Sequence, residues 1–355
     1  MNAPPRIVIA AGGTAGHVVP AIAVADALRA SGAEVSFVGG QRAEAELVPA
    51  AGYELDALNV EGMSRSNPLK AARAVGKAGL AVSAARKILR ERRADAVLGG
   101  GGYVAGPVGL AATLTKTPLV LTEADSHLGI SNRALASRAR RVCLAFPLNG
   151  REGERYRVTG RPVAPTITDR ALARAQLGIG ADETCVLVFG GSLGARSINT
   201  TAPLAFANAP YRVVHVAGAR DYPDLQAPGP HYVLLDYLTP FGIALVAADV
   251  AVARSGGSIF ELAQYGLPSV LIPYPHASAD HQSSNARWMA DAGAAVILGD
   301  AELSPERLRA ETDAVLARRA EMSAAALKLA RPNAAQDIAH EVLAAVTGEH
   351  VHPSE

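Results

Sequence analysis

Short apolar runs alternate with amphipathic stretches along the whole chain, and most of these runs end at a glycine-rich or polar turn. The first run, RIVIA (6–10), leads through the turn GGTAGHVVP (12–20) into a helix that we expect from about Pro20 to Arg29. Runs of this length indicate buried strands, and strands that alternate with helices favour a doubly wound parallel sheet. Further strands of the first half are predicted at 34–38, 96–98, 118–122 and 141–145.

The segment GRPVAP (160–165) is the best candidate for a linker, because it holds a glycine and two prolines and has no periodicity. The same pattern then starts again with a strand at 185–189, the turn GGSLGAR (190–196) and a helix at 198–208. The sequence therefore predicts an α/β protein with two doubly wound domains. Later strands are expected at 212–217, 231–235, 250–253 and 269–273, and a helical tail over about 312–347.

Composition agrees with two cores of this kind. The 355 residues are 49% hydrophobic but only 5% aromatic, which suits parallel sheets built from Val, Ile, Leu and Ala. Cys143 and Cys185 each lie inside an apolar run, so we interpret them as small buried hydrophobic residues in a reducing compartment. The sequence has no signal-peptide pattern, and its apolar stretches are too short to span a bilayer, so we expect a soluble or peripheral protein.

Charge is distributed unevenly, although the net value is only +1. Residues 1–160 hold 20 Lys and Arg against 13 Asp and Glu, a net +7, and the remainder has a net −6. The segment 65–93 has nine basic residues among leucine, valine and isoleucine, and one acid, Glu91. This pattern suits an anionic membrane surface, and a solvated helix is the alternative. Nucleic acid is disfavoured, because the segment offers no aromatic residue for base stacking.

The first glycine turn combines a candidate phosphate cradle with a candidate base. Glycines such as Gly16 let backbone N–H groups approach a ligand, the following helix N-terminus favours anions, and Thr14 adds a hydroxyl. The spacing is not that of a dinucleotide-binding fingerprint. His17 is a candidate general base, because imidazole titrates near neutral pH. A tight turn without a ligand, with His17 in a local hydrogen bond, is the alternative.

Two more segments of the first half follow predicted strands. The turn GGGGYVAGP (99–107) holds four consecutive glycines, which cost chain entropy and indicate close approach of backbone or ligand, with Tyr103 beside them. The segment TEADSHLGISNR (122–133) gathers Glu123, Asp125 and His127 where a strand would end at the ligand crevice. Asp125 and His127 could form an acid–base pair or bind sugar hydroxyls. A glycine-rich crossover and a solvated loop are the respective alternatives.

The second half offers a second set of candidates. Ser192 lies in the turn GGSLGAR, and 254–258 (RSGGS) form another polar turn at a predicted helix start, suited to a diphosphate. Glu261 lies about one turn into that helix, where a carboxylate can accept hydrogen bonds from both hydroxyls of a ribose. The segment HASADHQSSNA (276–286) is rich in amides and carboxylates suited to sugar hydroxyls. Its two histidines lack a third ligand at useful spacing, so a metal site is disfavoured.

Together the motifs GGTAGHVVPAIAVADAL, GGYVAGP, GGSLGARSIN and RSGG followed by GLPSVLIPYPH and DHQ resemble the MurG family of glycosyltransferase family 28. The resemblance covers nearly the whole chain. It implies a GT-B fold, with two Rossmann-like domains and a cleft between them. Residues 1–163 would form the acceptor- and membrane-facing domain and 164–334 the UDP-sugar-binding domain. A helix at about 335–355 would pack back on the first domain.

The same resemblance implies an activity. Its members are peripheral membrane hexosyltransferases of the cytoplasmic face of the bacterial plasma membrane that make lipid II for peptidoglycan. This chain would transfer N-acetylglucosamine from UDP-N-acetylglucosamine, with inversion, to the 4-hydroxyl of lipid-linked N-acetylmuramyl pentapeptide (lipid I). It would need no metal and no other cofactor, and the basic segment 65–93 would contact the membrane.

Residue roles follow from the matched motifs. The resemblance places Thr14, Gly16, Tyr103 and Glu123 on the acceptor side, with His17 or Asp125 as the base. It assigns to the donor Ser192 at the phosphate, Gly257 and Ser258 at the helix start, Glu261 at the ribose, Leu235 with its backbone at the uracil, His281 and Gln282 at the sugar hydroxyls, and Arg254 in the same set.

Three departures from the family pattern concern specificity. The family's H-E-Q-N is here Thr122 to Asp125, its G-N-P-V-R is here GRPVA with Arg161 and Ala164, and its phosphate-loop Gln is here Leu193. A related transferase with another lipid or small-molecule acceptor therefore stays an alternative. A nucleotide-sugar binder without catalysis and a nucleotide-sugar epimerase are two more. The binder would tolerate the loss of His17 and Asp125, and the epimerase would act on the donor without an acceptor.

Overall fold

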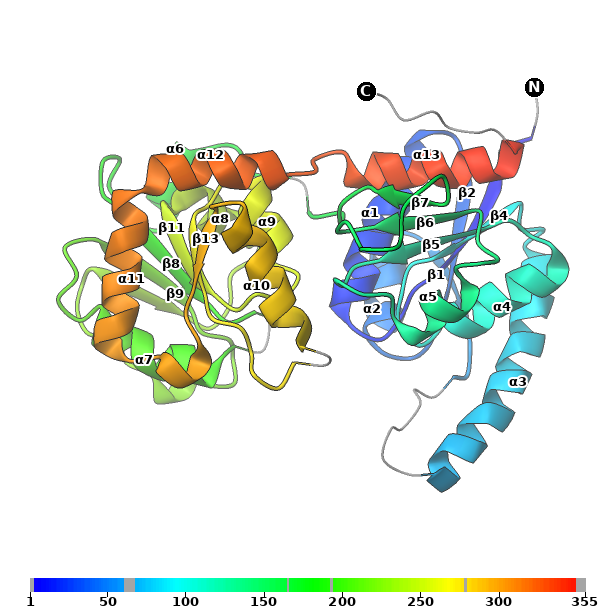
Figure 1. The fold of residues 1–355 in the computed structure, drawn as a ribbon, viewed down its shortest axis with the longest axis horizontal. Helices are drawn as coiled ribbons and strands as arrows, with labels where there is room; N and C mark the ends of the chain where they lie inside the picture. Colours follow the sequence, from blue (N-terminus) through cyan, green and yellow to red (C-terminus); the bar gives the residue numbers. More distant parts are fainter. Residues whose placement is uncertain (1–2, 61–67, 165, 192–193, 278–279, 349–355) are drawn as a thin grey trace. The chain divides into compact units, whose positions relative to one another are not determined.

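A computed structural model describes residues 3–60, 68–164, 166–191, 194–277 and 280–348, and for 68–78 the backbone alone. The chain divides into two compact units, residues 1–163 with 331–355 and residues 164–330 (Figure 1). Each unit is a parallel sheet with helices on its faces, as the alternating pattern predicts. The predicted segment 65–67 and Ser192 lie outside the described residues.

The first unit holds a sheet of strand order β3-β2-β1-β4-β5-β6-β7, in which every pairing is parallel. The chain leaves β1 in one direction to β2 and β3 and then returns to β4 on the other side. The switch point of this sheet therefore lies between β1 and β4. Its elements are β1 Arg6–Ala10, α1 Ala15–Ala30, β2 Glu34–Gly39, α2 Ala43–Ala50, β3 Glu54–Ala57, α3 Pro68–Glu91, β4 Ala96–Gly99, α4 Ala105–Thr115, β5 Leu119–Glu123, α5 Ile130–Leu135, β6 Arg141–Leu144, β7 Tyr156–Val158 and α13 Ala334–Thr347.

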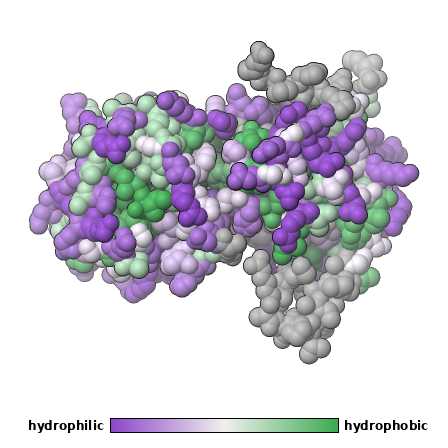
Figure 2. Space-filling model, viewed as in Figure 1, coloured by the Kyte–Doolittle hydropathy of each residue, from purple (hydrophilic) through white to green (hydrophobic). Residues whose placement is uncertain are grey.

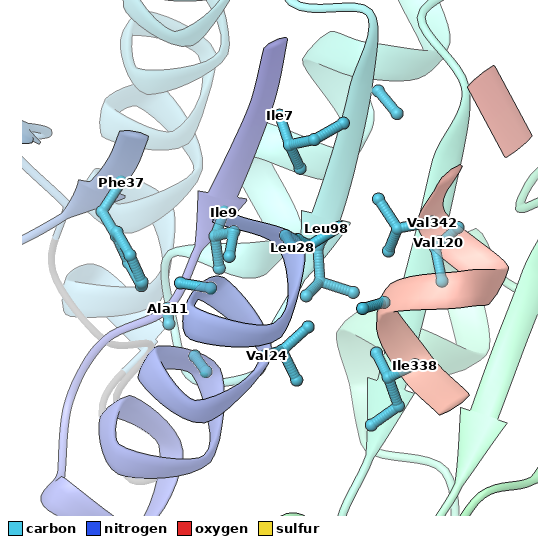
Figure 3. Close-up of a cluster of buried hydrophobic side chains, with 14 of the residues drawn as sticks. Ile7, Ile9, Ala11, Val24, Leu28, Phe37, Leu98, Val120, Ile338 and Val342 are labelled. Carbon is cyan, nitrogen blue, oxygen red and sulfur yellow. The ribbon is translucent and has the colours of Figure 1, made fainter. Parts of the chain in front are cut away.

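Alternate residues of the central strands fill two separate cores. Ile7 and Ile9 of β1 face α1 and α13, together with Leu98 and Val120 from the neighbouring strands (Figure 3). Val8 and Ala10 point to the opposite face, where α3, α4 and α5 pack. Successive side chains of a strand point to opposite faces, so a strand covered on both sides must be apolar throughout. This is why continuous apolar runs in the sequence predict the buried strands.

Helix α13 belongs to the first unit although it comes last in the chain. Ile338 and Val342 are buried in the core beside α1 (Figure 3). Glu341 is buried too, and its carboxylate accepts from Nε of Arg141 at 2.9 Å and pairs with Arg157 at 3.5 Å. Burying each of the two aliphatic side chains contributes about 1.5–3 kcal/mol, so α13 is an integral part of this unit.

The second unit repeats the plan with strand order β10-β9-β8-β11-β12-β13, again with parallel pairing throughout. Its switch point lies between β8 and β11. Val186 and Val188 of β8 and Val250 and Val252 of β11 are fully buried in its core. The elements are α6 Arg170–Gln176, β8 Cys185–Phe189, α7 Arg196–Ala205, β9 Arg212–Val216, β10 Tyr232–Leu235, α8 Gly242–Ala247, β11 Val250–Ala253, α9 Ile259–Gln264, β12 Ser269–Leu271, α10 His281–Asp291, β13 Ala295–Ile297, α11 Pro305–Ala317 and α12 Arg319–Leu329.

Two expectations need correction. The helix after the first glycine turn begins at Ala15 and not near Pro20, so Pro20 lies inside it. The helical tail begins at Pro305 and consists of three helices, with a break at 330–333 that contains Pro332. The sequence analysis also missed β3, β7 and β13, which are edge strands of three or four residues. β3 and β7 are partly exposed and lack a continuous apolar run, whereas β13 lies within the apolar run 294–298 (AAVIL), which the predictions above do not include.

Cys143 and Cys185 are both buried and free, and burial raises the pKa of both thiols, to about 12 for Cys185. On the face drawn in Figure 2, the surface of each unit is mainly hydrophilic, and hydrophobic residues are interspersed among the hydrophilic ones. Among the helices of the described residues, none has the length and apolar content needed to cross a bilayer.

Candidate functional site

The glycine-rich and polar turns lie at the switch points of the two sheets. The turn at 11–14 follows β1 and the turn at 100–104 follows β4, and these two strands are neighbours in the first sheet. In the second sheet the turns after β8 and β11 are neighbours in the same way. A crevice forms outside the carboxyl ends of the strands at such a point, and ligands bind there in open α/β sheets. Each unit therefore presents one candidate ligand-binding edge.

The first turn brings Thr14 and His17 together. Thr14 is the N-cap of α1, and its backbone oxygen accepts from the N–H groups of His17 at 3.0 Å and Val18 at 3.2 Å. Nδ1 of His17 lies 3.3 Å from the Thr14 hydroxyl. Burial and then the Arg161 guanidinium lower the pKa of His17 from its ordinary 6.5, against smaller opposite effects of Asp125 and Glu44. The imidazole is therefore mostly neutral at pH 7, as a base must be.

The four glycines 99–102 are required by close approach within the protein. A Cβ on Gly102 would overlap the carbonyl oxygen of Gly12, and one on Gly101 would come within 2.6 Å of the His17 ring. Both residues also have φ in the left-handed region, +100° for Gly101 and +78° for Gly102. Gly99 and Gly100 are packed against Leu121 and against α1. The run thus lets the two turns of the first unit lie against each other.

Glu44, to which the motifs assign no role, joins three segments of this edge. It is fully buried, and it accepts from the N–H of Gly13 at 2.8 Å, the N–H of Gly40 at 2.9 Å and the hydroxyl of Tyr103 at 2.9 Å. Burial opposes its charge, but these hydrogen bonds outweigh burial and hold the pKa of Glu44 below its ordinary value. Tyr103 thus directs its hydroxyl to Glu44, under the guanidinium of Arg42.

The loop after β5 is built around Glu123. Its carboxylate accepts from the N–H groups of Asp125 at 3.1 Å and Gly129 at 2.7 Å and from the amide of Asn132 at 2.9 Å. Burial raises its pKa in spite of these bonds. Asn132, which also donates to the backbone oxygen of Thr122, is a second residue without an assigned role in the sequence analysis. Glu123 therefore shapes the loop, whereas Asp125 is half-buried and close enough to influence His17.

The turn after β8 rests on a buried polar network. Gly194 has φ +74°, and a Cβ there would overlap the carbonyl oxygen of Ala217, which accepts from the side chain of Asn199 at 2.8 Å. Oδ1 of Asn199 lies 3.0 Å from Nε2 of His215, and Nδ1 of His215 lies 2.8 Å from the hydroxyl of Tyr232. Burial lowers the pKa of His215 to about 4. The Asn199–His215 pair was not predicted either.

Arg254 ties the two turns of the second unit together. Its guanidinium donates to the backbone oxygens of Ile272 and Pro273 at 3.1 Å, to Asp300 at 2.6 Å and to the hydroxyl of Ser197 at 2.8 Å. Ser197 lies in the first turn of α7 and also donates to Asp300 at 2.7 Å. All four contacts are internal to the protein, so Arg254 holds the carboxyl ends of β11 and β12 against the start of α7.

The other predicted donor residues lie along the same edge. Gly257 and Ser258 lead into α9, which carries Glu261 in its first turn, and all three are partly exposed. His281 and Gln282 begin α10, where Oε1 of Gln282 accepts from the N–H of Tyr274 at 3.0 Å. In the buried layer beneath them, Ser255 donates to the backbone oxygen of Gln282 at 2.8 Å and Asn285 donates to the backbone oxygen of Ser255 at 2.9 Å.

Leu235 ends β10, and its backbone oxygen accepts from the N–H of Ala217 at 2.9 Å. Within the described part of the chain, no group of three or more His, Cys, Asp or Glu side chains is arranged to hold a metal ion. The chemistry available at the two edges is therefore that of hydroxyls, amides, carboxylates, the half-buried imidazoles of His17 and His281, and backbone N–H groups.

Comparison with known proteins agrees with this geometry. A crystal structure of MurG from Acinetobacter baumannii has 29% sequence identity and a TM-score of 0.80, over 96% of this chain and 99% of that one. The two Rossmann-like parallel sheets and this structural similarity together assign the chain to the GT-B class of glycosyltransferase folds.

The family is equally clear. The description "Glycosyltransferase family 28 N-terminal domain" matches residues 7–144, and "Glycosyltransferase family 28 C-terminal domain" matches residues 185–342. A protein of Methylococcus capsulatus named UDP-N-acetylglucosamine--N-acetylmuramyl-(pentapeptide) pyrophosphoryl-undecaprenol N-acetylglucosamine transferase is 41% identical over 94% of this chain and 97% of its own length. One of the same name from Moorella thermoacetica is 39% identical over 96% and 99%. The chain belongs to glycosyltransferase family 28.

Proposed function

We propose that the protein transfers N-acetylglucosamine from UDP-N-acetylglucosamine to the 4-hydroxyl of lipid-linked N-acetylmuramyl pentapeptide, the lipid I to lipid II step of peptidoglycan synthesis. The observation that carries this is identity of about 40% over nearly the full length of relatives named for that reaction. The two turn-bearing sheet edges support it, because a transferase must bind two substrates. The product serves wall growth, and with it cell shape and division.

The transfer is a single displacement at the anomeric carbon. The acceptor oxygen forms a bond to C1, the bond from C1 to the diphosphate oxygen breaks, and UDP leaves with the electron pair. The hydroxyl proton passes to a base of the enzyme. Attack opposite the leaving group inverts the anomeric centre. Hydrogen-bond donors at the diphosphate stabilise the charge that develops there.

We assign the donor to the second unit. Gly257 and Ser258 would offer backbone and hydroxyl groups to the diphosphate, and Glu261 would accept from the ribose hydroxyls. Leu235 would present its backbone to the uracil, and His281 and Gln282 would contact the sugar hydroxyls. Ser192 is assigned to the phosphate by its motif alone. Arg254 would act by holding these turns in register.

We assign the acceptor to the first unit, with Thr14 and Gly16 at its turn and Tyr103 and Glu123 shaping the edge. His17 is the first candidate for the base and Asp125 the second, because both lie at this edge and the charge of Asp125 acts on the pKa of His17. His17→Ala should lower turnover about 100-fold or more if His17 is the base. Wild-type turnover in His17→Ala together with a large loss in Asp125→Asn would reverse the two roles.

A basic, apolar surface supports peripheral attachment to the cytoplasmic face of the plasma membrane. The end of α3 and the end of α4 enclose an open groove of about 410 Å³ lined by Arg90, Arg93, Lys116 and Leu114. Leu114 is 54% exposed, and Leu80 on α3 is 74% exposed. Cations beside exposed leucines attract a surface of anionic lipid. Arg90→Gln with Arg93→Gln should reduce sedimentation with phosphatidylglycerol vesicles and leave transfer to a detergent-soluble acceptor intact.

The decisive test uses the purified full chain with labelled UDP-N-acetylglucosamine, with and without a short-chain lipid I analogue. Label should pass to the lipid analogue and UDP should be released only when that acceptor is present. Epimerised sugar from donor alone would identify an epimerase. Donor binding without any product would identify a binder. Transfer to another lipid or glycoside, with none to the lipid I analogue, would favour the alternative acceptor that the replaced residues Thr122, Ala124 and Arg161 suggest.

A further inference from the structure

The start of α1, next to the turn that carries Thr14, lacks one of its helical backbone hydrogen bonds. Pro20 lies inside α1 and has no N–H, so the backbone oxygen of Gly16, four residues earlier, lacks its helical hydrogen bond. The guanidinium of Arg161, which lies 145 residues away in the sequence, donates to this oxygen at 2.8 Å. A long-range cation thus occupies the position that an N–H of residue 20 would have filled.

The other end of the turn is held by an anion. Glu44 of α2 accepts the N–H of Gly13 through one carboxylate oxygen and the N–H of Gly40 and the hydroxyl of Tyr103 through the other. The carboxylate is fully buried, and it accepts hydrogen bonds from all three donors. Removing a charged acceptor from such a position leaves its donors without partners, which is unfavourable for each buried group.

We propose that Glu44 and Arg161 are positioning residues, which hold the backbone at Gly13 in the turn and at Gly16 in the first turn of α1, and thereby fix the imidazole of His17 at the acceptor edge. This inference rests on the proposed function, in which His17 is the candidate base. Neither residue was assigned a role by the motifs, and Arg161 stands where the resembled family has Asn. We call Glu44 and Arg161, with the backbone they hold, the clamp. The clamp joins three segments of one unit: α1, α2 and the stretch after β7.

The two residues also act on His17 in opposite senses. Among the groups that face the imidazole, Arg161 lowers the pKa of His17, whereas Asp125 and Glu44 raise it, and burial lowers it most. A base works only in its deprotonated form, so activity falls as the pH drops through its pKa. Loss of the Arg161 charge should therefore move the acidic limb of the rate profile to higher pH. Loss of the Glu44 charge should move it to lower pH.

This opposition makes the proposal testable with Glu44→Gln and Arg161→Gln in the full-length enzyme. Matched controls are Glu46→Gln, an exposed acid of the same helix, and Arg155→Gln, an exposed arginine immediately before β7. Both test variants should lower kcat about tenfold or more, because a misplaced base is costly, with KM for UDP-N-acetylglucosamine unchanged within about twofold. Arg161→Lys should recover part of kcat, since an ammonium group can donate to the Gly16 oxygen.

A second readout does not depend on turnover. The Cε1–H signal of His17 in histidine-labelled protein, identified by its loss in His17→Ala, should titrate at higher pH in Arg161→Gln and at lower pH in Glu44→Gln. Shifts in the same direction, or none in a variant whose circular dichroism and Tm match the wild type, would overturn the clamp. If Glu44→Gln does not fold, the Arg161 pair decides alone. If the wild type transfers no sugar, the proposed function fails, and the titrations still judge the clamp.

Discussion

The two glycine turns occupy equivalent places in the two sheets but are held by different chemistry. The first, after β1, is held by ionised side chains, Glu44 at Gly13 and Arg161 at Gly16. The second, after β8, is contacted by a neutral amide, Asn199, which is itself held by His215, Tyr232 and the buried carboxylate of Asp221. Charges from other segments tune the proton affinity of a neighbouring imidazole. The second support keeps its charge state near neutrality, because burial lowers the pKa of His215 to about 4 and the hydrogen bond from Arg220 holds the pKa of Asp221 below its ordinary value.

The hydrogen bonds of the second network also define its tautomer. The amide of Asn199 donates to Ala217 and to Asp221, at 2.8 and 2.9 Å, so its oxygen is the acceptor that faces His215. His215 must then carry its proton on Nε2, and Nδ1 accepts from the hydroxyl of Tyr232 at 2.8 Å. The chain Tyr232–His215–Asn199 therefore has one consistent direction of donation.

The sharpest way to break the first turn is Gly102→Ala. The added methyl group would overlap the carbonyl oxygen of Gly12, and the residue has φ +78°, so the two turns of the first unit must separate. We expect a loss of about 3 kcal/mol or more in the free energy of unfolding, measured in urea, together with loss of transfer activity. Gly150→Ala is the matched control, because it has φ +71° and open space around it. It should cost only about 1 kcal/mol. Equal effects in the two variants would refute the close-approach argument.

The corresponding break in the second turn is Asn199→Ala. It leaves the Nε2–H of His215 and the oxygen of Ala217 without partners in a fully buried site. We expect a loss of about 2–3 kcal/mol in unfolding free energy and weaker UDP binding, with the His17 titration unchanged. Asn208→Ala, at an exposed position after the same helix, should be near neutral. A shift of the His17 titration in Asn199→Ala would contradict the separation of the two turns.

Acid should weaken the second network. His215 is neutral in the folded unit with a pKa of about 4, against 6.5 for an ordinary histidine. The free energy of unfolding therefore includes the full contribution of this group above pH 6.5. That contribution is lost as the pH falls from 6.5 towards 4, because in this range only the unfolded chain takes up the proton. This group alone should remove about 2 kcal/mol between pH 7 and pH 5. Urea unfolding of the wild type and of His215→Gln at pH 7 and at pH 5 measures this loss of unfolding free energy. An equal pH dependence in the variant would argue against His215 as the source.

The mildest change in the first turn is Tyr103→Phe. It removes one of the three donors to Glu44 and leaves the N–H groups of Gly13 and Gly40 in place. We expect a loss of about 1 kcal/mol in unfolding free energy and a fall of a few-fold in kcat. Tyr156→Phe, whose hydroxyl receives a longer bond of 3.3 Å from Arg151, is the control. A larger effect than that of Glu44→Gln would mean that Tyr103 acts on the substrate directly.

Much of the fold was predictable because its central strands are buried on both faces. The strands 6–10 and 185–189 are predicted with the bounds that the structure has, since each is an uninterrupted apolar run that ends at glycine. The edge strands β3 and β7 lack that signal, whereas β13 lies in the apolar run 294–298 (AAVIL) and was predictable by the same rule. The start of α1 was misplaced because Pro20 is usual in the first turn of a helix, and here it lies inside the helix.

The site was less predictable, because its supports act over long sequence distances on backbone atoms. Glu44 serves Gly13 and Gly40, and no spacing rule links a helix carboxylate to a turn 31 residues earlier. The pair Gly39–Gly40 at a strand end, with an acid four residues on, is the one local signal. For Arg161 the signal was present in two places, a proline inside α1 and a departure from the family's hinge pattern. Their connection needed the fold.

The proposal that the second unit binds the donor and the first unit the acceptor is tested most directly by calorimetric titration. UDP is titrated into the wild type, Glu261→Gln and His17→Ala. If the second unit binds the donor, Glu261→Gln should weaken UDP binding about tenfold, by loss of the charged acceptor for the ribose hydroxyls. His17→Ala should bind UDP within about twofold of the wild type. Equal weakening in both variants, or no weakening in Glu261→Gln, would contradict the account.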